Sequence, residues 1–318
     1  MKKKLAHIRI ALNELKRDFN STGNPEFAKS RIEADIIRNV HSIEKGLCLE
    51  KPRSGFGAAK ISDLFSLAEK YLSLNPDDLE CLYFVLDGVE TYLEYHAKIG
   101  FENDTITGIK DKYEQLKSKL PQKTGEFGGI KTVSLSEMNF DMEDVEKLFN
   151  TRHSIREFSG ESVDEEDIKK AIALAQRCPS ACNRQGVRIY SVKGDKFLAD
   201  IEQNLEGVGG FAQDVDRFLI ITGKQSVYSV DEKNQFAVSA SIFAGYLTLA
   251  LHAYKIGACV IQRPLIPREY WSKFRRKNEI PEDEQIVMLI GIGKYKETTK
   301  VPLSKRFEVE KIYRKLDK

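Results

Sequence analysis

The stretch "TRHSIREFSGESVDEEDIKKAIALAQRCPSACNRQGVRIYSV", residues 151–192, contains two short polar motifs on either side of a helical pattern. It begins with a short cationic segment made of Arg152, His153, Ser154 and Arg156. Guanidinium, imidazole and hydroxyl groups this close together suit a phosphate ligand. The same composition is also common in solvated turns, so this segment alone leaves both interpretations open.

A second polar cluster, "CPSACNRQ" (178–185), follows the helical pattern of residues 164–178. The hydroxyl of Ser180 and the amides of Asn183 and Gln185 could pair with the edge of a planar heterocycle. The C-x-x-x-C spacing of Cys178 and Cys182 differs from the redox motif C-x-x-C, and no second pair completes a zinc site. We therefore expect no metal and interpret both thiols as small buried groups.

Outward from this stretch, the C-terminal part mixes helices and strands. Short β-branched runs predict strands at 187–192, 217–222, 258–261 and 285–293. Residues 234–255 predict a long, almost wholly apolar helix, which belongs in a core or in a subunit interface. Tyr228 and Phe243 could line a substrate pocket, although aromatic residues in such runs more often serve packing.

The N-terminal part reads as helical throughout. A stripe of apolar residues spans 5–19, and further helices are expected at 25–46, 61–74, 76–100 and 104–120. Residues 121–140 contain Pro121, Gly125 and a Gly128-Gly129 pair and predict a linker. The division is therefore 1–120 as a helical extension, 121–140 as a linker and 141–318 as a second domain.

Composition limits the classes of function. The net charge is +2, with 21 basic and 21 acidic residues up to residue 140 and 29 and 27 after it, so we expect no nucleic-acid partner. No uninterrupted apolar run reaches the length of a membrane span, and we expect no such span. The N-terminus does not fit a signal peptide, because charged residues interrupt its apolar positions. Five cysteines without an export signal indicate a cytoplasmic protein.

Residues 141–318 resemble the nitroreductase family of FMN-dependent oxidoreductases. The family begins with R-[RH]-S-[IV]-R-x-[FY] and continues, after a helix, with A-P-S-x-x-N-x-Q-P-W and a strand. "TRHSIREF" and "CPSACNRQ" stand in the same order at a similar separation. "HAYKIGACVIQ" and "IGIGKYKETTKVPLSKRF" are similar to the family's later segments. The resemblance implies an α+β fold with a central, mostly antiparallel sheet flanked by helices, dimeric, with an all-α extension added at the N-terminus.

The resemblance also implies roles for particular residues. The expected FMN-binding residues are Arg152, His153, Ser154, Arg156, Pro179, Ser180, Ala181, Asn183, Gln185, Val260, Ile261, Gln262, Arg263, Lys305 and Arg306. The first four would hold the phosphate, ribityl chain and pyrimidine edge. Residues 179–183 would approach the flavin from the other subunit, and Gln185 would stand behind them. Residues 260–263 would lie beside N5, and Lys305 or Arg306 would contact the phosphate.

The implied activity is hydride transfer from NAD(P)H through FMN to a quinone, nitro or enone acceptor. Arg156 is the expected catalytic residue, because a cation stabilises the negative charge of the reduced ring. The sequence departs from the family pattern at Gly186-Val187, where Pro-Trp is usual, and at Gln262-Arg263. These departures leave the acceptor undefined, and Arg263 could equally be a surface residue or bind an anionic substrate.

Two alternatives remain open from the sequence. One is an FMN enzyme of other chemistry, such as substrate dehydrogenation, reductive dehalogenation or flavin breakdown; the other is a non-catalytic interaction protein. The N-terminal extension is similar to that of nitroreductase-like proteins from bacterial surface-polysaccharide gene clusters. Its most site-like segment holds Arg38, His41 and Lys45, which we interpret as solvated charges on a helix.

Overall fold

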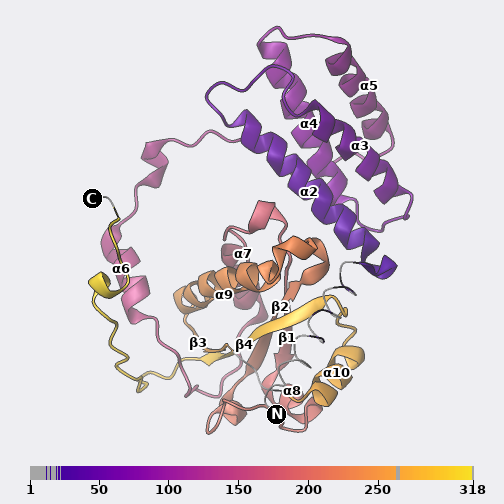
Figure 1. Cartoon of the computed structure of the whole chain (residues 1–318). Helices are drawn as coiled ribbons and strands as arrows, with labels where there is room; N and C mark the ends of the chain where they lie inside the picture. The colour runs from indigo at the N-terminus through magenta and orange to yellow at the C-terminus, as the bar shows by residue number, and fades with distance from the viewer. Residues whose placement is uncertain are drawn as a thin grey trace.

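The computed structural model describes residues 12, 15, 19, 21, 23–262 and 266–316. The helix expected over 5–19 therefore lies largely outside the described residues, as does Arg263. A bundle of helices forms one part of the molecule, and a sheet covered by helices forms the other (Figure 1). Each part has its own buried apolar core.

The helical bundle confirms the all-α expectation for the N-terminal part. Its helices are α2 (Ala28–Leu47), α3 (Ala58–Leu72), α4 (Glu80–Lys98) and α5 (Asp104–Ser118). Apolar residues recur on one face of each helix, and these faces meet in a shared core that includes Ile36, Ile61 and Leu82, none of which is exposed. The side chain of Asn103 accepts a hydrogen bond from the amide of Ile106 and so fixes the start of α5.

The segment after the bundle is attached to it. Asp87 is buried on α4 and accepts hydrogen bonds from the amides of Phe127 and Gly128, while Glu44 accepts one from the amide of Gly129 at 3.0 Å. Gly129 has a φ of +102° and packs against Thr91, so a side chain would not fit there. The first half of the expected linker thus packs on the bundle, and the three-part division of the chain stays a prediction.

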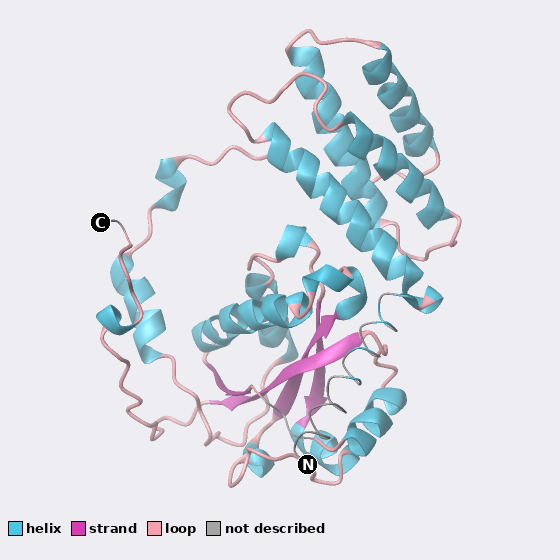
Figure 2. Ribbon diagram, in the orientation of Figure 1, coloured by secondary structure: helices cyan, strands magenta, loops and turns pink. Residues whose placement is uncertain are grey.

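The sheet has four strands in the order β1-β2-β4-β3, and every neighbouring pair is antiparallel. The strands are β1 (Val187–Lys193), β2 (Arg217–Lys224), β3 (Ile256–Ile261) and β4 (Glu284–Lys294). Figure 2 shows them as the only described strands of the molecule. The α+β expectation is confirmed, and each expected strand forms.

Helices cover both faces of the sheet. On one face, α7 (Glu165–Ala175) and α9 (Gln235–Ala253) pack against alternate strand residues such as Leu219 and Ile290. On the other face, α8 (Gly194–Asp200) and α10 (Arg268–Lys277) pack against the intervening residues, such as Phe218 and Leu289. The strands β2, β3 and β4 are therefore largely buried on both sides, which explains their mainly apolar sequence, whereas the edge strand β1 is only partly buried.

The helix α9 is only partly covered. Phe243 and Leu247 pack into the core, whereas Val238, Ile242 and Tyr246 are 49, 38 and 46% exposed along the opposite stripe. Among the described residues, α9 is the one helix whose length and composition would allow it to cross a membrane, which the sequence analysis did not anticipate. Its packing on the sheet makes it the main core helix of the α+β part.

Two further segments leave the core. The helix α6 (Met142–Thr151) precedes the cationic motif, and its Met142 and Phe149 are exposed. The C-terminal tail runs away from the sheet (Figure 1), and residues 302–316 are all exposed. Its large apolar side chains include Leu303, Phe307 and Leu316.

Candidate functional site

The cationic motif lies along the edge strand of the sheet. The amide of Ile155 donates to the carbonyl of Ala258 at 2.9 Å, and Ser154 forms a parallel bridge with the same residue of β3. The structure therefore brings residues 152–156 next to the strand that carries Val260 and Ile261, and Gln262 follows directly after this strand. The two segments lie far apart in the sequence, which gave no sign of this contact, but the resemblance to the nitroreductase family implied it.

The cations of this motif are available to a ligand. Arg152, His153 and Ser154 are half-buried, and Arg156 is exposed with its guanidinium 6.0 Å from the ring of Phe211. In the described part of the chain, neither Arg152 nor Arg156 forms an ion pair with a carboxylate. Two neighbouring arginines without an acidic partner, one half-buried and one exposed, fit an anionic group such as a phosphate.

His252 supports the motif from the last turn of α9, and the sequence analysis did not identify it. Its Nε2 lies 2.8 Å from the hydroxyl of Thr151, and its Nδ1 lies 2.9 Å from the hydroxyl of Tyr295. Burial lowers the pKa of His252, and the nearby charges of Arg152 and His153 lower it further. His252 is thus a neutral ring that joins the start of the motif to the end of β4.

The second motif forms a tight loop after α7. A 3₁₀ turn spans Ala181–Asn183, and Cys182, Asn183 and Gln185 have φ values of 53°, 57° and 48°. Left-handed backbone is unfavourable for residues with a side chain, so the surroundings must hold this loop. Inside the loop, the amide of Gln185 donates to the hydroxyl of Ser180 at 3.2 Å.

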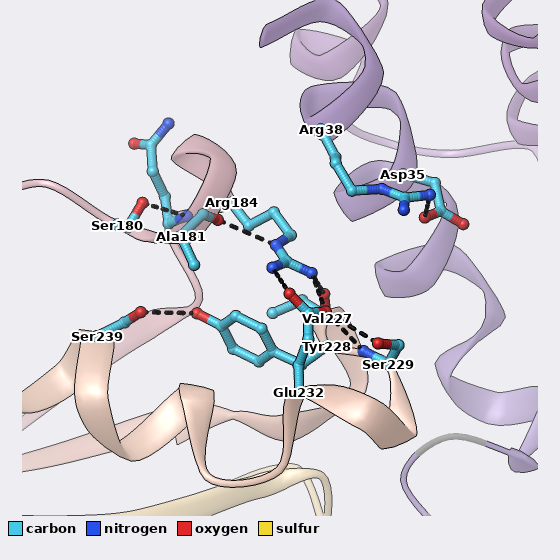
Figure 3. Close-up of polar contacts among 11 residues, drawn as sticks. Asp35, Arg38, Ser180, Ala181, Arg184, Val227, Tyr228, Ser229, Glu232 and Ser239 are labelled. Atoms are coloured by element: carbon cyan, nitrogen blue, oxygen red, sulfur yellow. Dashed lines mark hydrogen bonds and ion pairs between the residues drawn. The ribbon is translucent and has the colours of Figure 1, made fainter. Parts of the chain in front are cut away.

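Arg184 holds the loop in place (Figure 3). Its side chain is 3% exposed, forms a two-pronged ion pair with Glu232, and donates to the carbonyls of Ala181 at 3.0 Å and Val227 at 3.2 Å. Its guanidinium lies 4.5 Å from the ring of Tyr228. The hydrogen bond from Arg184 lowers the pKa of Glu232 from 4.5 to about 2.

Sequence reasoning missed Arg184, although it stands inside the motif. A buried arginine cannot be told from a surface arginine by residue type alone. The one available signal was the dense run of polar residues around it. Figure 3 also shows Arg38 of α2 with Asp35, a 2.8 Å pair on one helix that agrees with the solvated-charge interpretation.

The remaining expected residues divide into two groups. Pro179 and Gln185 are exposed beside Ser180, Ala181 and Asn183, so the loop is brought together as expected. Lys305 and Arg306 are exposed on the tail, where Lys305 pairs with Glu308 at 3.5 Å and Arg306 donates to the carbonyl of Ser304. In the described chain, these two side chains have no contact with the cationic motif.

The two motifs lie at opposite ends of α9. Ser239 in its first turns accepts a hydrogen bond from Tyr228, which packs on Arg184, and His252 in its last turn contacts Thr151. Thirteen residues of helix separate these positions, or about 20 Å at 1.5 Å per residue. A single chain therefore presents two half-sites rather than one closed site.

The five cysteines are all free but differ in burial. Cys81 and Cys259 are buried, Cys178 and Cys182 are half-buried, and Cys48 is exposed, so the two thiols of the second motif are less buried than expected. Burial raises the pKa of Cys178 and of Cys259. In the part of the chain that the structure describes, no group of three or more His, Cys, Asp or Glu is arranged to hold a metal ion.

Comparison with known proteins agrees with the motif assignment. The model of the nitroreductase family matches residues 150–208. Among solved structures, a nitroreductase family protein from Streptococcus pneumoniae TIGR4 is 21% identical and has a TM-score of 0.45; the match covers 54% of this chain and 99% of that one. No curated protein matches the chain.

Of two further similar structures, one is of an FMN-dependent enzyme and the other contains FMN. An FMN-dependent nitroreductase from Clostridium difficile R20291 is 21% identical over 52% of this chain and 96% of that one, with a TM-score of 0.44. A structure from Desulfovibrio desulfuricans in complex with FMN is 16% identical over 55% of this chain and 96% of that one, with a TM-score of 0.45. The nitroreductase family model matches residues 150–208, and this segment contains both motifs.

Proposed function

We propose that the chain is an FMN-dependent oxidoreductase that passes hydride from NAD(P)H to a quinone, nitro or enone acceptor. One observation carries this proposal. The half-buried Arg152 and the exposed Arg156 lie beside β3, and neither has a carboxylate partner among the described residues. The match of the nitroreductase family model to residues 150–208 supports the identity of the cofactor. FMN would supply the redox-active ring, and the protein would bind and orient it.

Each motif has a defined role in this proposal. Arg152 and His153 bind the phosphate and ribityl chain, and the hydroxyl of Ser154 hydrogen-bonds to the ring edge. Arg156 is the catalytic residue, because its exposed guanidinium can stabilise negative charge on the reduced ring. The loop 180–185 covers the ring from the other subunit.

A homodimer would complete this site. The outward stripe of α9, with Val238, Ile242 and Tyr246, is an apolar surface of the kind that subunit interfaces cover. The exposed Leu303 and Phe307 of the tail are apolar groups that a second copy would also cover. Two copies would bring the loop of one to the cationic motif of the other and would give Lys305 and Arg306 a phosphate to contact.

The substitution Arg152→Ala tests the proposal. We expect the dissociation constant for FMN, measured by quenching of flavin fluorescence, to rise about ten-fold or more, since a hydrogen bond to a charged group contributes about 1.5–3 kcal/mol. Arg177→Ala is the matched control, because Arg177 is exposed and precedes the loop. Equal FMN affinities for both variants would contradict the role given to Arg152.

The donor and the class of reaction are tested on the FMN-loaded protein. Anaerobic addition of NADH or NADPH should bleach the flavin absorbance, and a quinone or nitroaromatic should restore it. A bound flavin that neither nicotinamide reduces would refute the oxidoreductase assignment while leaving FMN binding intact.

A further inference from the structure

A cavity of about 540 Å³ lies between the helical bundle and the α+β part. This volume falls within the range of about 300–1,000 Å³ that is common for small-molecule sites. Its bundle side is lined by Ser30, Glu33, Ala34 and Ile37 of α2. These residues follow the spacing of one helix face, so α2 turns one face to its own core and another to the cavity.

The opposite side of the cavity is largely apolar at its base. Ile172 of α7, Val187 and Ile189 of β1, and Phe243 of α9 line it. Ser180 and Gln185 of the flavin loop line the same space. A ligand in this cavity would therefore rest its apolar body on the sheet and touch the loop that we assign to the flavin.

The bundle side carries a fixed negative charge. An oxygen of Glu33 accepts a 2.7 Å hydrogen bond from the hydroxyl of Tyr71, whose side chain is buried. In the described chain, Glu33 has no ion pair, and Asp78 and Glu80 line the same wall. Burial, with the charge of Glu33, raises the pKa of Cys81 to about 12, so this neighbouring thiol stays neutral.

The α+β side carries the opposite charge. Lys224 and Arg188 line that wall, and the guanidinium of Arg188 donates only to the carbonyls of Gln185 and Val187. Within the described residues, no ion pair joins Glu33 to either cation across the cavity. The cavity is therefore negative at α2, positive at the ends of β1 and β2, and apolar between them.

We propose that this cavity binds a small aromatic or similarly apolar molecule that carries an ammonium group, with Glu33 as the residue that recognises the ammonium. The hydrogen bond from Tyr71 holds the carboxylate toward its ligand, and the electron-rich end of the ligand faces Lys224 and Arg188. Binding is independent of the flavin. Reduction of the bound molecule rests on the function proposed above, because Ser180 and Gln185 belong to the flavin loop.

Three probes of one shape and different charge test the proposal: 4-nitrobenzylamine, 4-nitrobenzyl alcohol and 4-nitrobenzoate. Calorimetric titration of the full chain should show the protonated amine binding about ten-fold more tightly than the alcohol, the effect expected for a charged hydrogen bond. Glu33→Gln should remove this preference and leave the alcohol unchanged. Glutamine still accepts the hydrogen bond of Tyr71, so the variant should fold. The exposed Glu69 provides the matched control, Glu69→Gln.

Equal affinities of the wild-type chain for the three probes would overturn the proposal, as would an unchanged preference in Glu33→Gln. Ile37→Trp, which narrows the cavity from α2, should weaken all three probes, and no effect would place the binding elsewhere. A titration of the same variants with FMN separates the two proposals. If the chain binds FMN but shows no preference for the amine, only the proposed cavity site is refuted. If the chain prefers the amine but does not bind FMN, only the proposed cofactor is refuted.

Discussion

Replacing Arg184 with methionine should destabilise the α+β part, because this one side chain satisfies several buried partners. The substitution keeps the length and apolar stem of the side chain but removes the ion pair with Glu232 and the hydrogen bonds to the carbonyls of Ala181 and Val227. Breaking a buried ion pair costs about 3–5 kcal/mol. Glu232 keeps 34% of its side chain in water, so we expect a smaller loss of about 2–3 kcal/mol.

Urea unfolding followed by the fluorescence of Trp271 measures this loss. Trp271 is the only tryptophan of the chain and stacks on Phe274, which belongs to the core beneath the sheet. Its signal therefore reports on the α+β part. Arg177→Met is the matched control, since Arg177 is exposed between the end of α7 and the loop.

The pH dependence of the loss gives a second measurement. Because the folded state lowers the pKa of Glu232 from 4.5 to about 2, its stabilising contribution is fully present above the ordinary pKa and is lost as the pH falls toward the lower value. The difference in unfolding free energy between wild type and Arg184→Met should therefore shrink as the pH falls from 4.5 toward 2.

If Arg184→Met and Arg177→Met unfold at the same urea concentration, Arg184 does not hold the loop. A difference that stays constant from neutral to acidic pH would show that the ion pair with Glu232 is not its source.

Two further predictions concern the other parts of the molecule. His96 is fully buried in the bundle. Its Nδ1 lies 2.8 Å from the carbonyl oxygen of Tyr92, and its Nε2 accepts a hydrogen bond from the amide of Gly55 at 2.9 Å. His96→Leu should therefore lower the free energy of unfolding by about 1–3 kcal/mol, which circular dichroism can measure. A loss below about 0.5 kcal/mol, typical of surface changes, would show that these bonds contribute little. The proposed homodimer predicts that the wild-type chain is dimeric in light scattering and that Tyr246→Glu is monomeric, whereas Leu74→Glu, an exposed bundle position, should not change the mass. A wild-type monomer would contradict the proposed homodimer, and a Tyr246→Glu variant that remains dimeric would exclude α9 from the interface.

The strands were predictable because their sequence pattern is strong. β2 and β4 are buried on both faces, and such strands require runs of β-branched and large apolar residues that few other segments contain. The helices of the bundle were equally clear from their 3.6-residue periodicity. The helices α8 and α10 were not identified. The seven residues of α8 are too few to show a period, and the apolar face of the strongly basic α10, with Tyr270, Trp271 and Phe274, was overlooked.

The site was only partly predictable, since residue type does not reveal environment. The resemblance pointed to the loop 179–185, but the clamp by Arg184 depends on Glu232, 48 residues away. His252 likewise acquires its role from Thr151, 101 residues away. Contacts of this kind follow from tertiary packing, which the local pattern of a sequence does not contain.

The attachment of the expected linker to the bundle also could not be predicted from the local sequence pattern. Gly125, Gly128 and Gly129 indicated a flexible connection, yet backbone amides of this segment are satisfied by Asp87 and Glu44 of the bundle. A carboxylate that accepts amide hydrogen bonds looks in sequence like any solvated helical acid. Only the fold shows which acids are buried and which amides reach them.

Titration of the chain with FMN is the decisive measurement for the proposed cofactor site. We expect saturable quenching of flavin fluorescence with one FMN bound per chain, and a much weaker affinity when Arg152 is replaced by alanine. The absence of any saturable quenching would contradict the proposed FMN site, and binding that Arg152→Ala leaves unchanged would contradict the role of Arg152.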